Sequence, residues 1–490
     1  MSETTSREEG GGNFAPNIPS HNLPPVEYRD LPEPKKLRHI VGASVIILAT
    51  AIGSGEFVLW PYITSQIGLV FLWGAIVGFL IQYFINMEIE RYTLATGETA
   101  ITGFARFWKP WWWLFILFVM FQNFWPGWAT GASTTLSYIF GFGGDAITYL
   151  TVAALIAIGI ALTTSPVVYQ TVEKIQGAMV ISIMAFVLVA VFFGTTGEGW
   201  GAIVSEGIGG ATLPIGQEGL GIALLLGALA FAGAGGANNL VQSNYIRDKG
   251  MGMGMRIPRV VSPITGEEEA SEGIGFMFPQ DVSNMRRWKQ WWRVANIEQF
   301  VTFFVIGVTS LIVFAVLTRS TVPPGETEAA DLEFIRVEGE VLREVIGPGF
   351  GIAFWLAGTF ALFSTNLGIV DYTCRLIADQ LNTNAARGNQ FWTESKLYFL
   401  FVWLMVVLGS SILLFGFNQP LVLIIISSSI AGLQMFIYSG LLIQLNRKAL
   451  PEGVRLTGYR LVVMWISFAF FGFFSVILVY SVIRTNIFGG

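Results

Sequence analysis

Apolar stretches of about 20 residues recur along the whole chain, and each is long enough to cross the hydrocarbon core of a bilayer as an α-helix. Hydrophobic residues fill 53% of the 490 positions and charged residues 12%, about half the charged share of soluble domains. This pattern predicts an all-α integral membrane protein with about 11 transmembrane helices over residues 38–484. The predicted spans are 39–63, 67–92, 111–140, 146–164, 168–195, 219–245, 294–318, 348–378, 395–416, 420–445 and 458–484.

Two polar segments lie outside the predicted spans. Residues 1–37 are polar, contain many prolines and glycines and have no apolar run, so they predict a disordered cytoplasmic tail rather than a signal peptide. The long loop 246–293 ends with Trp288, Trp291 and Trp292 among basic residues. Their spacing places the three rings on one helix face, which predicts an interfacial helix that anchors the loop at the membrane surface. A role in gating or partner binding is the alternative.

Basic residues are concentrated in alternate loops, and this distribution predicts the orientation. The loop 246–293 is basic, whereas residues 196–218 carry Glu198, Glu206 and Glu218 and no lysine or arginine. The N-terminus is therefore expected in the cytoplasm, and an odd number of spans places the C-terminus on the other side. We expect a multi-pass protein of a bacterial cell inner membrane.

The chain lacks the residue patterns of common enzymes. One cysteine and two histidines argue against a zinc site of the His/Cys kind. There is no phosphate-binding Gly-Lys-Ser/Thr loop and no Ser/His/Asp set. We therefore expect no enzymatic activity, no cofactor and no nucleic acid partner. The expected partners are the lipid bilayer and a small ion or molecule, whose transport would be driven by gradients.

Glu56 is the only charged residue within the first predicted span, and Gly53, Ser54 and Gly55 precede it. A carboxylate at mid-bilayer is costly unless it meets a partner, a proton or a cavity. Gly-Ser-Gly favours a break in the helix, and many secondary transporters build their substrate site at such a break. We predict a broken first span with Glu56 as cation ligand or proton carrier. A permanently protonated structural Glu56 is the alternative.

The sixth predicted span contains a second interruption. Gly233, Gly235 and Gly236 are followed by Asn238 and Asn239. Spans one and six are corresponding members of two five-span halves, so their interruptions predict two inverted five-helix repeats with a mid-membrane site between them. Close helix packing through small residues is the alternative for the glycines. The asparagines either bind the cargo or satisfy the backbone of the broken helix.

Two further polar residues complete the predicted site. Asn366 in span eight and Gln434 in span ten either line the site or bridge helices. Glu56 and Asn238 are the predicted metal ligands, because carboxylate and amide oxygens suit hard divalent cations. The full predicted set is Gly53, Ser54, Glu56, Gly233, Gly236, Asn238, Asn239, Asn366 and Gln434.

Two charged pairs lie near the cytoplasmic ends of spans two and eight. Glu88 and Arg91 are three residues apart, and Asp371 and Arg375 are four apart, so each pair shares a helix face. We interpret them as inner-gate or structural pairs, with direct contact to the cargo as the alternative.

Three stretches of the chain resemble the natural-resistance-associated macrophage protein (NRAMP) family of divalent-metal transporters. They are Gly53-Ser-Gly-Glu-Phe57, Met87-Glu-Ile-Glu-Arg-Tyr-Thr-Leu-Ala-Thr-Gly-Glu98 and Asp371-Tyr-Thr-Cys-Arg-Leu-Ile-Ala-Asp379. They are most similar to a divergent bacterial NRAMP-like branch with a Gly-Ser-Gly-Glu first-span motif. The resemblance implies a leucine-transporter-like fold of the amino acid–polyamine–organocation superfamily. It also implies secondary active transport of divalent metals, including symport with protons.

The chain departs from the metal-binding motifs of that family. The first-span motif Asp-Pro-Gly-Asn is replaced by Gly53-Ser-Gly-Glu56, so the carboxylate lies three residues later. The sixth-span motif Met-Pro-His aligns with Gly236-Ala-Asn238, which has neither thioether nor imidazole. These losses shift the expected preference toward hard ions such as magnesium or manganese. Glycines at both interruptions would also enlarge the cavity, which permits an organic cargo.

Three functions therefore remain open. The first is secondary transport of a divalent cation of the manganese, magnesium or iron class, with that cation as cargo. The second is transport of a small organic solute, including a cationic one, with Glu56 as counter-ion. The third is a membrane sensor or scaffold that transports nothing. An aromatic cage for the second function could come from Phe57, Trp60, Trp125, Trp128 and Phe231.

Overall fold

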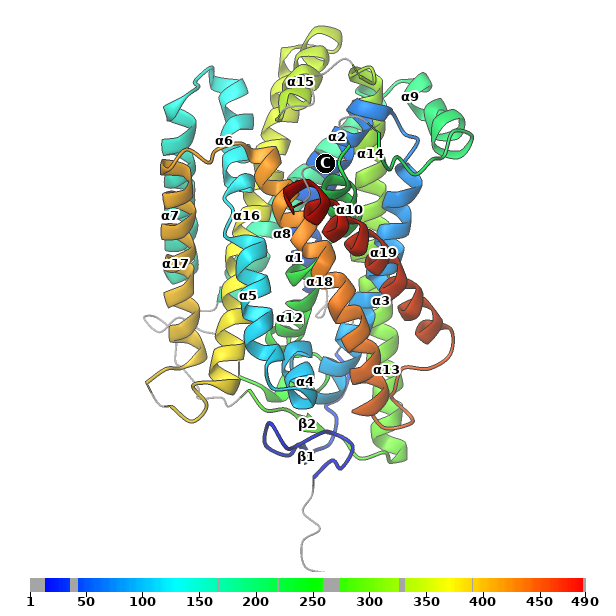
Figure 1. Ribbon diagram of the computed structural model, residues 1–490, viewed down its shortest axis with the longest axis vertical. Helices are drawn as coiled ribbons and strands as arrows, with labels where there is room; N and C mark the ends of the chain where they lie inside the picture. Colours follow the sequence, from blue (N-terminus) through cyan, green and yellow to red (C-terminus); the bar gives the residue numbers. More distant parts are fainter. Residues whose placement is uncertain are drawn as a thin grey trace, which may run out of the picture.

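The computed structural model describes residues 14–35, 43–164, 168–217, 220–258, 273–325, 331–389 and 391–487. Nine helices of this part of the chain are long and apolar enough to span a membrane. Two further predicted spans are interrupted, because 111–140 is divided into two helices and 219–245 into three. The continuous and interrupted segments together account for the predicted spans and confirm the all-α membrane fold (Figure 1).

The elements follow one another as a nearly unbroken series of helices. The first half comprises β1 (Glu27–Tyr28), α1 (Ala43–Ala51), π-helical η2 (Ile52–Leu59), α2 (Trp60–Ile67), α3 (Leu72–Thr96), α4 (Ala100–Phe107), α5 (Trp111–Asn123), α6 (Gly127–Phe140), α7 (Asp145–Thr164), α8 (Val168–Phe193), α9 (Gly197–Ala202), η3 (Ile203–Ile208), α10 (Ile222–Ala230), α11 (Ala237–Leu240) and α12 (Gln242–Lys249). The second half comprises η4 (Gly252–Arg256), β2 (Phe276–Met277), α13 (Val282–Gln299), π-helical η5 (Phe300–Val305), α14 (Ile306–Thr321), α15 (Glu333–Val345), α16 (Pro348–Asn384), α17 (Glu394–Leu414), α18 (Pro420–Lys448) and α19 (Tyr459–Ile487).

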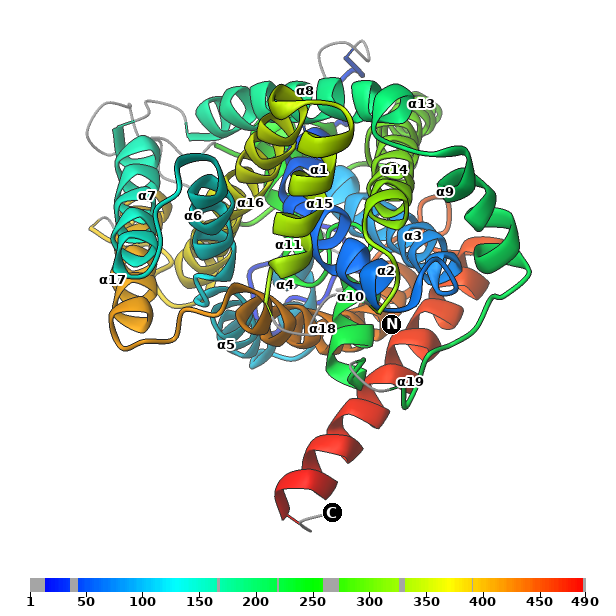
Figure 2. The same ribbon diagram turned by 90° about the horizontal axis from the view of Figure 1, so that it is seen from above.

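The helices of spans one and six lie inside the bundle. Seen from above, α1 and α10 lie near the centre, whereas α7, α13 and α19 lie at the periphery (Figure 2). The long helix α16 packs against α1, η2, α5, α6 and α8. Helix α18 packs against α10 and α19. Spans one and six are therefore enclosed by helices from both halves of the chain.

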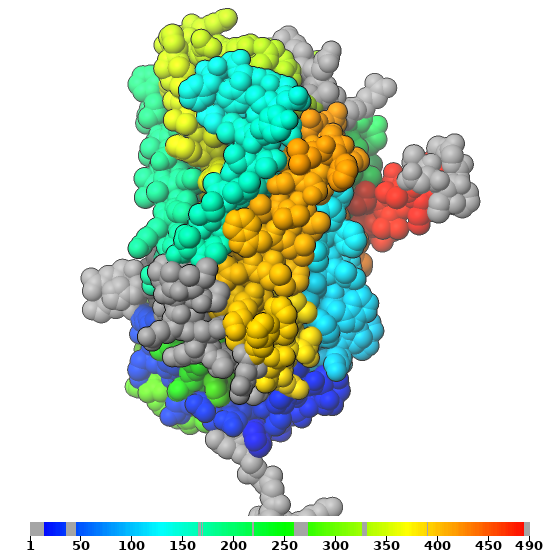
Figure 3. All heavy atoms as spheres, turned by 90° about the vertical axis from the view of Figure 1, so that its left-hand side faces the viewer, coloured from blue at the N-terminus to red at the C-terminus, as the bar shows by residue number. Residues whose placement is uncertain are grey.

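Residues 14–35, here called the N-terminal segment, are folded against the end of the bundle that carries α4 and β2. Val26 and Leu31 are fully buried, and β1 pairs in parallel with β2. The Trp291 indole donates to the carbonyl of Pro32 over 2.9 Å. In Figure 3 this segment, in blue, covers the lower end of the molecule. The prediction of a disordered tail over 1–37 is therefore wrong for residues 14–35, because distant residues of α4, η4 and α13 hold them; the rest of that tail lies outside the described residues.

The tryptophans of α13 do not anchor the helix in the membrane as predicted. Trp288 and Trp291 are 4% and 0% exposed, so they lie inside the protein. The Trp288 ring stacks between Phe278 and Trp292, with centroid distances of 5.8 Å to each. Helix α13 instead continues through η5 into α14, and residues Val282–Thr321 form one helix of 40 residues. The interfacial helix that was predicted for the loop 246–293 is the first part of this long helix.

Candidate functional site

The first span stays helical where the sequence predicted a break. Gly53, Ser54, Gly55 and Glu56 lie within the π-helical turn η2, and all four are buried. π-Helical turns widen a helix and occur frequently at functional sites. A Cβ atom at Gly53 would lie 2.3 Å from the Ala361 carbonyl oxygen, so this glycine allows α16 to approach closely. The predicted unwinding is wrong, because these glycines serve close packing within a continuous helix.

Glu56 is buried in this π-helical turn without a compensating charge. Its side chain is 0% exposed, and the Ser310 hydroxyl on α14 donates to its Oε2 atom. Its Oε1 atom has no hydrogen-bond partner among the described residues, and none of them forms an ion pair with it. A carboxylate in this setting is costly at membrane depth and marks a functional site by default.

The predicted break in span six is confirmed. Helix α10 ends at Ala230, and α11 begins at Ala237 after a non-helical stretch. Gly233, Gly235 and Gly236 have φ angles of 110°, 63° and 59°, in the region that favours glycine. This stretch touches η2, since a Cβ atom at Gly55 would lie 1.5 Å from the Phe231 carbonyl oxygen.

Gln82 on α3 stabilises the non-helical stretch of span six, and the sequence analysis did not identify this residue. Its Nε2 atom donates to the carbonyls of Ala230 and Ala232 over 2.7 Å each. Its Oε1 atom accepts from the Gly235 amide over 2.9 Å. These bonds satisfy backbone groups that the broken helix leaves free. The signal in the sequence was the lone glutamine in the apolar first part of α3, before the polar residues that begin at Asn86.

The two predicted asparagines of span six have different surroundings. Asn239 is held in a side-chain network, because it donates to Asn86 over 2.6 Å and accepts from Tyr438 over 2.8 Å. Asn238 donates to the Ile47 carbonyl over 3.4 Å, and its Oδ1 atom has no partner among the described residues. Asn239 is therefore a structural residue, whereas Asn238 keeps an oxygen available.

The predicted metal ligands Glu56 and Asn238 lie at different positions along the axis of span one. Ile47, which bonds Asn238, precedes Glu56 by nine positions, or about 13 Å along a helix. Within the described ranges, no group of three His, Cys, Asp or Glu side chains is placed to hold a metal ion. The structure thus does not bring the two predicted ligands together.

A third interruption lies in span three, between α5 and α6. Gln122 at the end of α5 accepts from the Ala237 amide over 3.0 Å and from the Gln434 side chain over 2.8 Å. Gln434 therefore reaches the broken span six through Gln122. Unpartnered buried atoms gather here among the described residues: Gln122 Nε2, Asn123 Nδ2, Trp128 Nε1 and Gln434 Oε1. The sequence analysis had placed Gln434 in the predicted site and Trp128 in the aromatic cage for an organic cargo, whereas Gln122 and Asn123 were interpreted as bridges between helices.

Asn366 lies beside the contact between α16 and span one. Its neighbour Thr365 accepts from the Gly53 amide over 3.1 Å and donates to the Thr50 carbonyl over 2.8 Å. The Nδ2 atom of Asn366 itself has no partner in the described part of the chain. Helix α16 therefore contributes a further buried polar atom close to span one that could bind a ligand.

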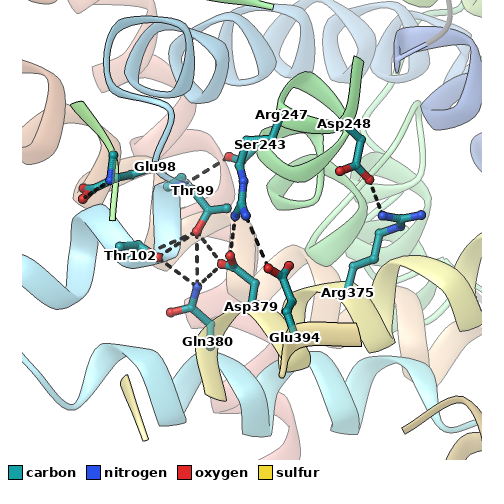
Figure 4. Close-up of polar contacts among 12 residues, drawn as sticks. Glu98, Thr99, Thr102, Ser243, Arg247, Asp248, Arg375, Asp379, Gln380 and Glu394 are labelled. Atoms are coloured by element: carbon teal, nitrogen blue, oxygen red, sulfur yellow. Dashed lines mark hydrogen bonds and ion pairs between the residues drawn. The ribbon is translucent and has the colours of Figure 1, made fainter. Parts of the chain in front are cut away.

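Buried ion pairs close the end of the bundle that carries the N-terminal segment. Arg375 bonds Asp371, as the spacing predicted, over 2.8 Å, and it also bonds Asp248 on α12. Arg247 lies between Asp379 and Glu394 (Figure 4). These bonds join α12, α16 and α17.

The second predicted pair is also present. Arg91 donates to Glu88 over 2.6 Å, and both side chains are buried. The Arg91 guanidinium also lies 4.2 Å from the Trp292 ring, which connects α3 to α13. The pair therefore bridges helices at the same end as the Arg375 network, away from Glu56.

At the opposite end, α15 carries a buried acid, Glu338. The Thr318 hydroxyl donates to it over 2.9 Å, and burial raises the pKa of Glu338 to about 8. Because this pKa lies above the ordinary value of 4.5, the stabilising effect of the proton is complete below pH 4.5 and is lost as the pH rises through 8. We expect wild-type stability to fall by about 2–3 kcal/mol between pH 6 and pH 9 from this group.

Thermal unfolding of Glu338→Gln across that pH range checks this expectation. The stability of this variant should not show the fall of about 2–3 kcal/mol between pH 6 and pH 9, because its amide does not titrate. Glu344→Gln, on the exposed side of the same helix, is the control and should retain the decline. A wild-type decline that persists unchanged in Glu338→Gln would contradict the assignment.

An interrupted span six lies beside span one, with α16 and the divided third span packed around them. The chain has a leucine-transporter-like fold, as its likeness to three solved transporter structures shows. The structure is similar to that of the Eremococcus coleocola manganese transporter in complex with an aromatic bis-isothiourea substituted compound, with a TM-score of 0.67 and 12% identity, covering 96% of this chain and 92% of that chain. It is also similar to the nucleobase-cation-symport-1 family transporter Mhp1 with bromovinylhydantoin bound (TM-score 0.52, 14% identity, 92% and 95% covered). MhsT in complex with L-phenylalanine has a TM-score of 0.52 and 16% identity, with 92% and 99% covered. No protein-family model and no curated protein matches the chain.

Proposed function

We propose that the protein is a secondary transporter of a divalent cation of the magnesium or manganese class, with Glu56 as cation ligand. The observation that carries this proposal is the Glu56 carboxylate, which is fully buried and has one oxygen without a partner among the described residues. A carboxylate at this depth needs a proton or a cation. Exchange between the two would couple cation binding to proton movement during alternating access.

The donor atoms around Glu56 favour a hard and partly hydrated ion. Ser310 provides a hydroxyl oxygen, and the Phe231 carbonyl lies against Gly55, next to Glu56. Magnesium keeps several of its waters and binds through one or two carboxylates, so a single carboxylate with neutral oxygens suits it. The shared fold with a manganese transporter supports the same cargo class.

A small organic solute is the second candidate, and one observation favours it. The N–H groups of Gln122 and Trp128 are buried and unpartnered among the described residues. Such donors cannot bind a metal ion, but they can bind carbonyl or carboxylate oxygens of an organic molecule. The Trp128 ring also lies 6.0 Å from the ring of Phe231, at the break in span six.

Flux measurements in proteoliposomes test the proposal. Vesicles would hold the wild type, Glu56→Gln or the control Glu338→Gln, which removes a buried carboxylate elsewhere. We expect saturable magnesium or manganese uptake that responds to a pH gradient in the wild type and in the control. In Glu56→Gln we expect uptake to fall at least about tenfold, since a charge-assisted interaction of about 1.5–3 kcal/mol is lost.

Each alternative has its own outcome. Metal flux that survives Glu56→Gln would remove Glu56 from the cation site. Absence of flux for both metals in folded wild type would favour the organic solute. In that case, Trp128→Phe should weaken binding of the organic cargo, because it deletes the unpartnered N–H group and keeps the ring. Absence of any flux would favour the sensor or scaffold.

A further inference from the structure

The exposed face of the long helix Val282–Thr321 is basic up to Arg293 and apolar from Ile297 onward. Helix α13 lies at the periphery of the bundle, so this face is not covered by other helices (Figures 1 and 2). Exposed side chains recur on it three or four residues apart, except for the adjacent pair Phe300 and Val301, which keeps them on one side. In chain order they are Arg286, Lys289, Arg293, Ile297, Phe300, Val301 and Val305.

The three cations of this face have no partner. Arg286, Lys289 and Arg293 are exposed, and none of them forms an ion pair with a described residue. By contrast, Arg287 on the neighbouring face bonds Glu33 over 2.8 Å. A hollow of about 590 Å³ lies among the three cations. The acid that lines it, Asp281, is engaged with Asn284 at the start of α13 over 2.6 Å.

The apolar part of the face indicates where the bilayer begins. Ile297, Phe300 and Val301 are 42%, 46% and 47% exposed, which suits contact with lipid chains. Arg286, Lys289 and Arg293 come directly before this apolar part of the helix. Long basic side chains near the end of a membrane helix extend to the interface with water. The three cations therefore lie at the depth of the lipid phosphates.

We propose that this face binds an anionic phospholipid. The phosphate of its headgroup lies among Arg286, Lys289 and Arg293, and an acyl chain follows Ile297 to Val305. Three unpaired cations complement an anionic headgroup, and each contributes about fivefold in affinity near a membrane surface. A free phosphate ion would leave the apolar part of the face unused, so the continuous stripe favours a lipid.

Lipid binding to the detergent-solubilised protein tests this proposal. Native mass spectrometry would follow titration with dioleoyl phosphatidylglycerol and, separately, dioleoyl phosphatidylcholine. We expect the wild type to prefer phosphatidylglycerol at low salt. The triple variant Arg286→Gln/Lys289→Gln/Arg293→Gln should lose roughly 100-fold in affinity for it. Salt should weaken binding to the wild type, because the interaction is screened.

A matched control distinguishes the loss of this binding face from a general loss of positive charge. Arg387→Gln/Arg447→Gln/Lys448→Gln removes three other exposed cations from the same end of the bundle and should keep the preference. Equal losses in both triple variants would overturn the proposal, as would an unchanged preference in the first variant. Competition by inorganic phosphate as strong as that of the lipid would also overturn it, because the site would then recognise phosphate alone.

Discussion

Replacing Gly55 with alanine is expected to destabilise the protein by at least about 3 kcal/mol and to abolish transport. A Cβ atom at this position would lie 1.5 Å from the carbonyl oxygen of Phe231. The obstacle is backbone, so no side-chain rotation relieves the clash, and spans one and six must separate. This contact joins the π-helical turn that carries Glu56 to the break in span six. Thermal unfolding and flux in proteoliposomes measure the two effects.

Gly177→Ala is the matched control for this prediction. Gly177 also lies within a membrane helix, α8, but a Cβ atom there would meet nothing within 4 Å. Alanine has the higher helix propensity, so this variant should be as stable as the wild type or slightly more stable. If Gly55→Ala were as stable as Gly177→Ala, spans one and six would not approach each other as closely as the structure has them.

The fold could be predicted from the sequence because bilayer thickness sets the length of each apolar run. The break in span six was also predictable, since the closely spaced Gly233, Gly235 and Gly236 allow φ angles that other residues avoid. The same logic was wrong for span one. Gly53 and Gly55 remain helical and instead allow close packing against Ala361 and Phe231. Local sequence does not reveal which of these two uses a glycine has, because the neighbouring backbone decides it.

Interactions between distant residues account for the other differences. Glu56 and Asn238 were expected to share one site, but Asn238 bonds Ile47, which lies nine positions before Glu56 on span one. The distance between Glu56 and Asn238 along the bundle depends on how span six is positioned lengthwise against span one. The sequence of neither span alone determines that position. The N-terminal segment likewise becomes ordered through partners such as Arg106 on α4, more than 80 positions away. Its polar composition was consistent with disorder only as long as those partners were unknown.

Arg106→Leu is expected to destabilise the protein by about 3–5 kcal/mol, because it leaves the Glu98 carboxylate buried and unpaired. Both side chains are 0% exposed, and Arg106 Nε donates to Glu98 over 2.8 Å. Burial raises the pKa of Glu98, but the charge and hydrogen bonds of Arg106 outweigh it and hold that pKa below 4.5. The stabilising effect is therefore present above pH 4.5 and is lost as the pH falls through the lowered pKa.

The same substitution should release the N-terminal segment. Arg106 Nη1 donates to the carbonyls of Pro19 and Pro24 over 2.8 and 3.0 Å. Limited proteolysis should therefore cut residues 14–35 faster in Arg106→Leu than in the wild type. The double variant Glu98→Gln/Arg106→Leu should recover part of the stability, since no buried charge remains, but not the protection of the segment.

A matched arginine substitution separates the buried pair from the general effect of losing a positive charge. Arg336 pairs with Glu333 and Glu340 on α15, but its side chain is 42% exposed. Arg336→Leu should therefore cost no more than about 1 kcal/mol and leave proteolysis of the N-terminal segment unchanged. Equal destabilisation by Arg336→Leu and Arg106→Leu would contradict the account, because burial is the physical difference between the two ion pairs.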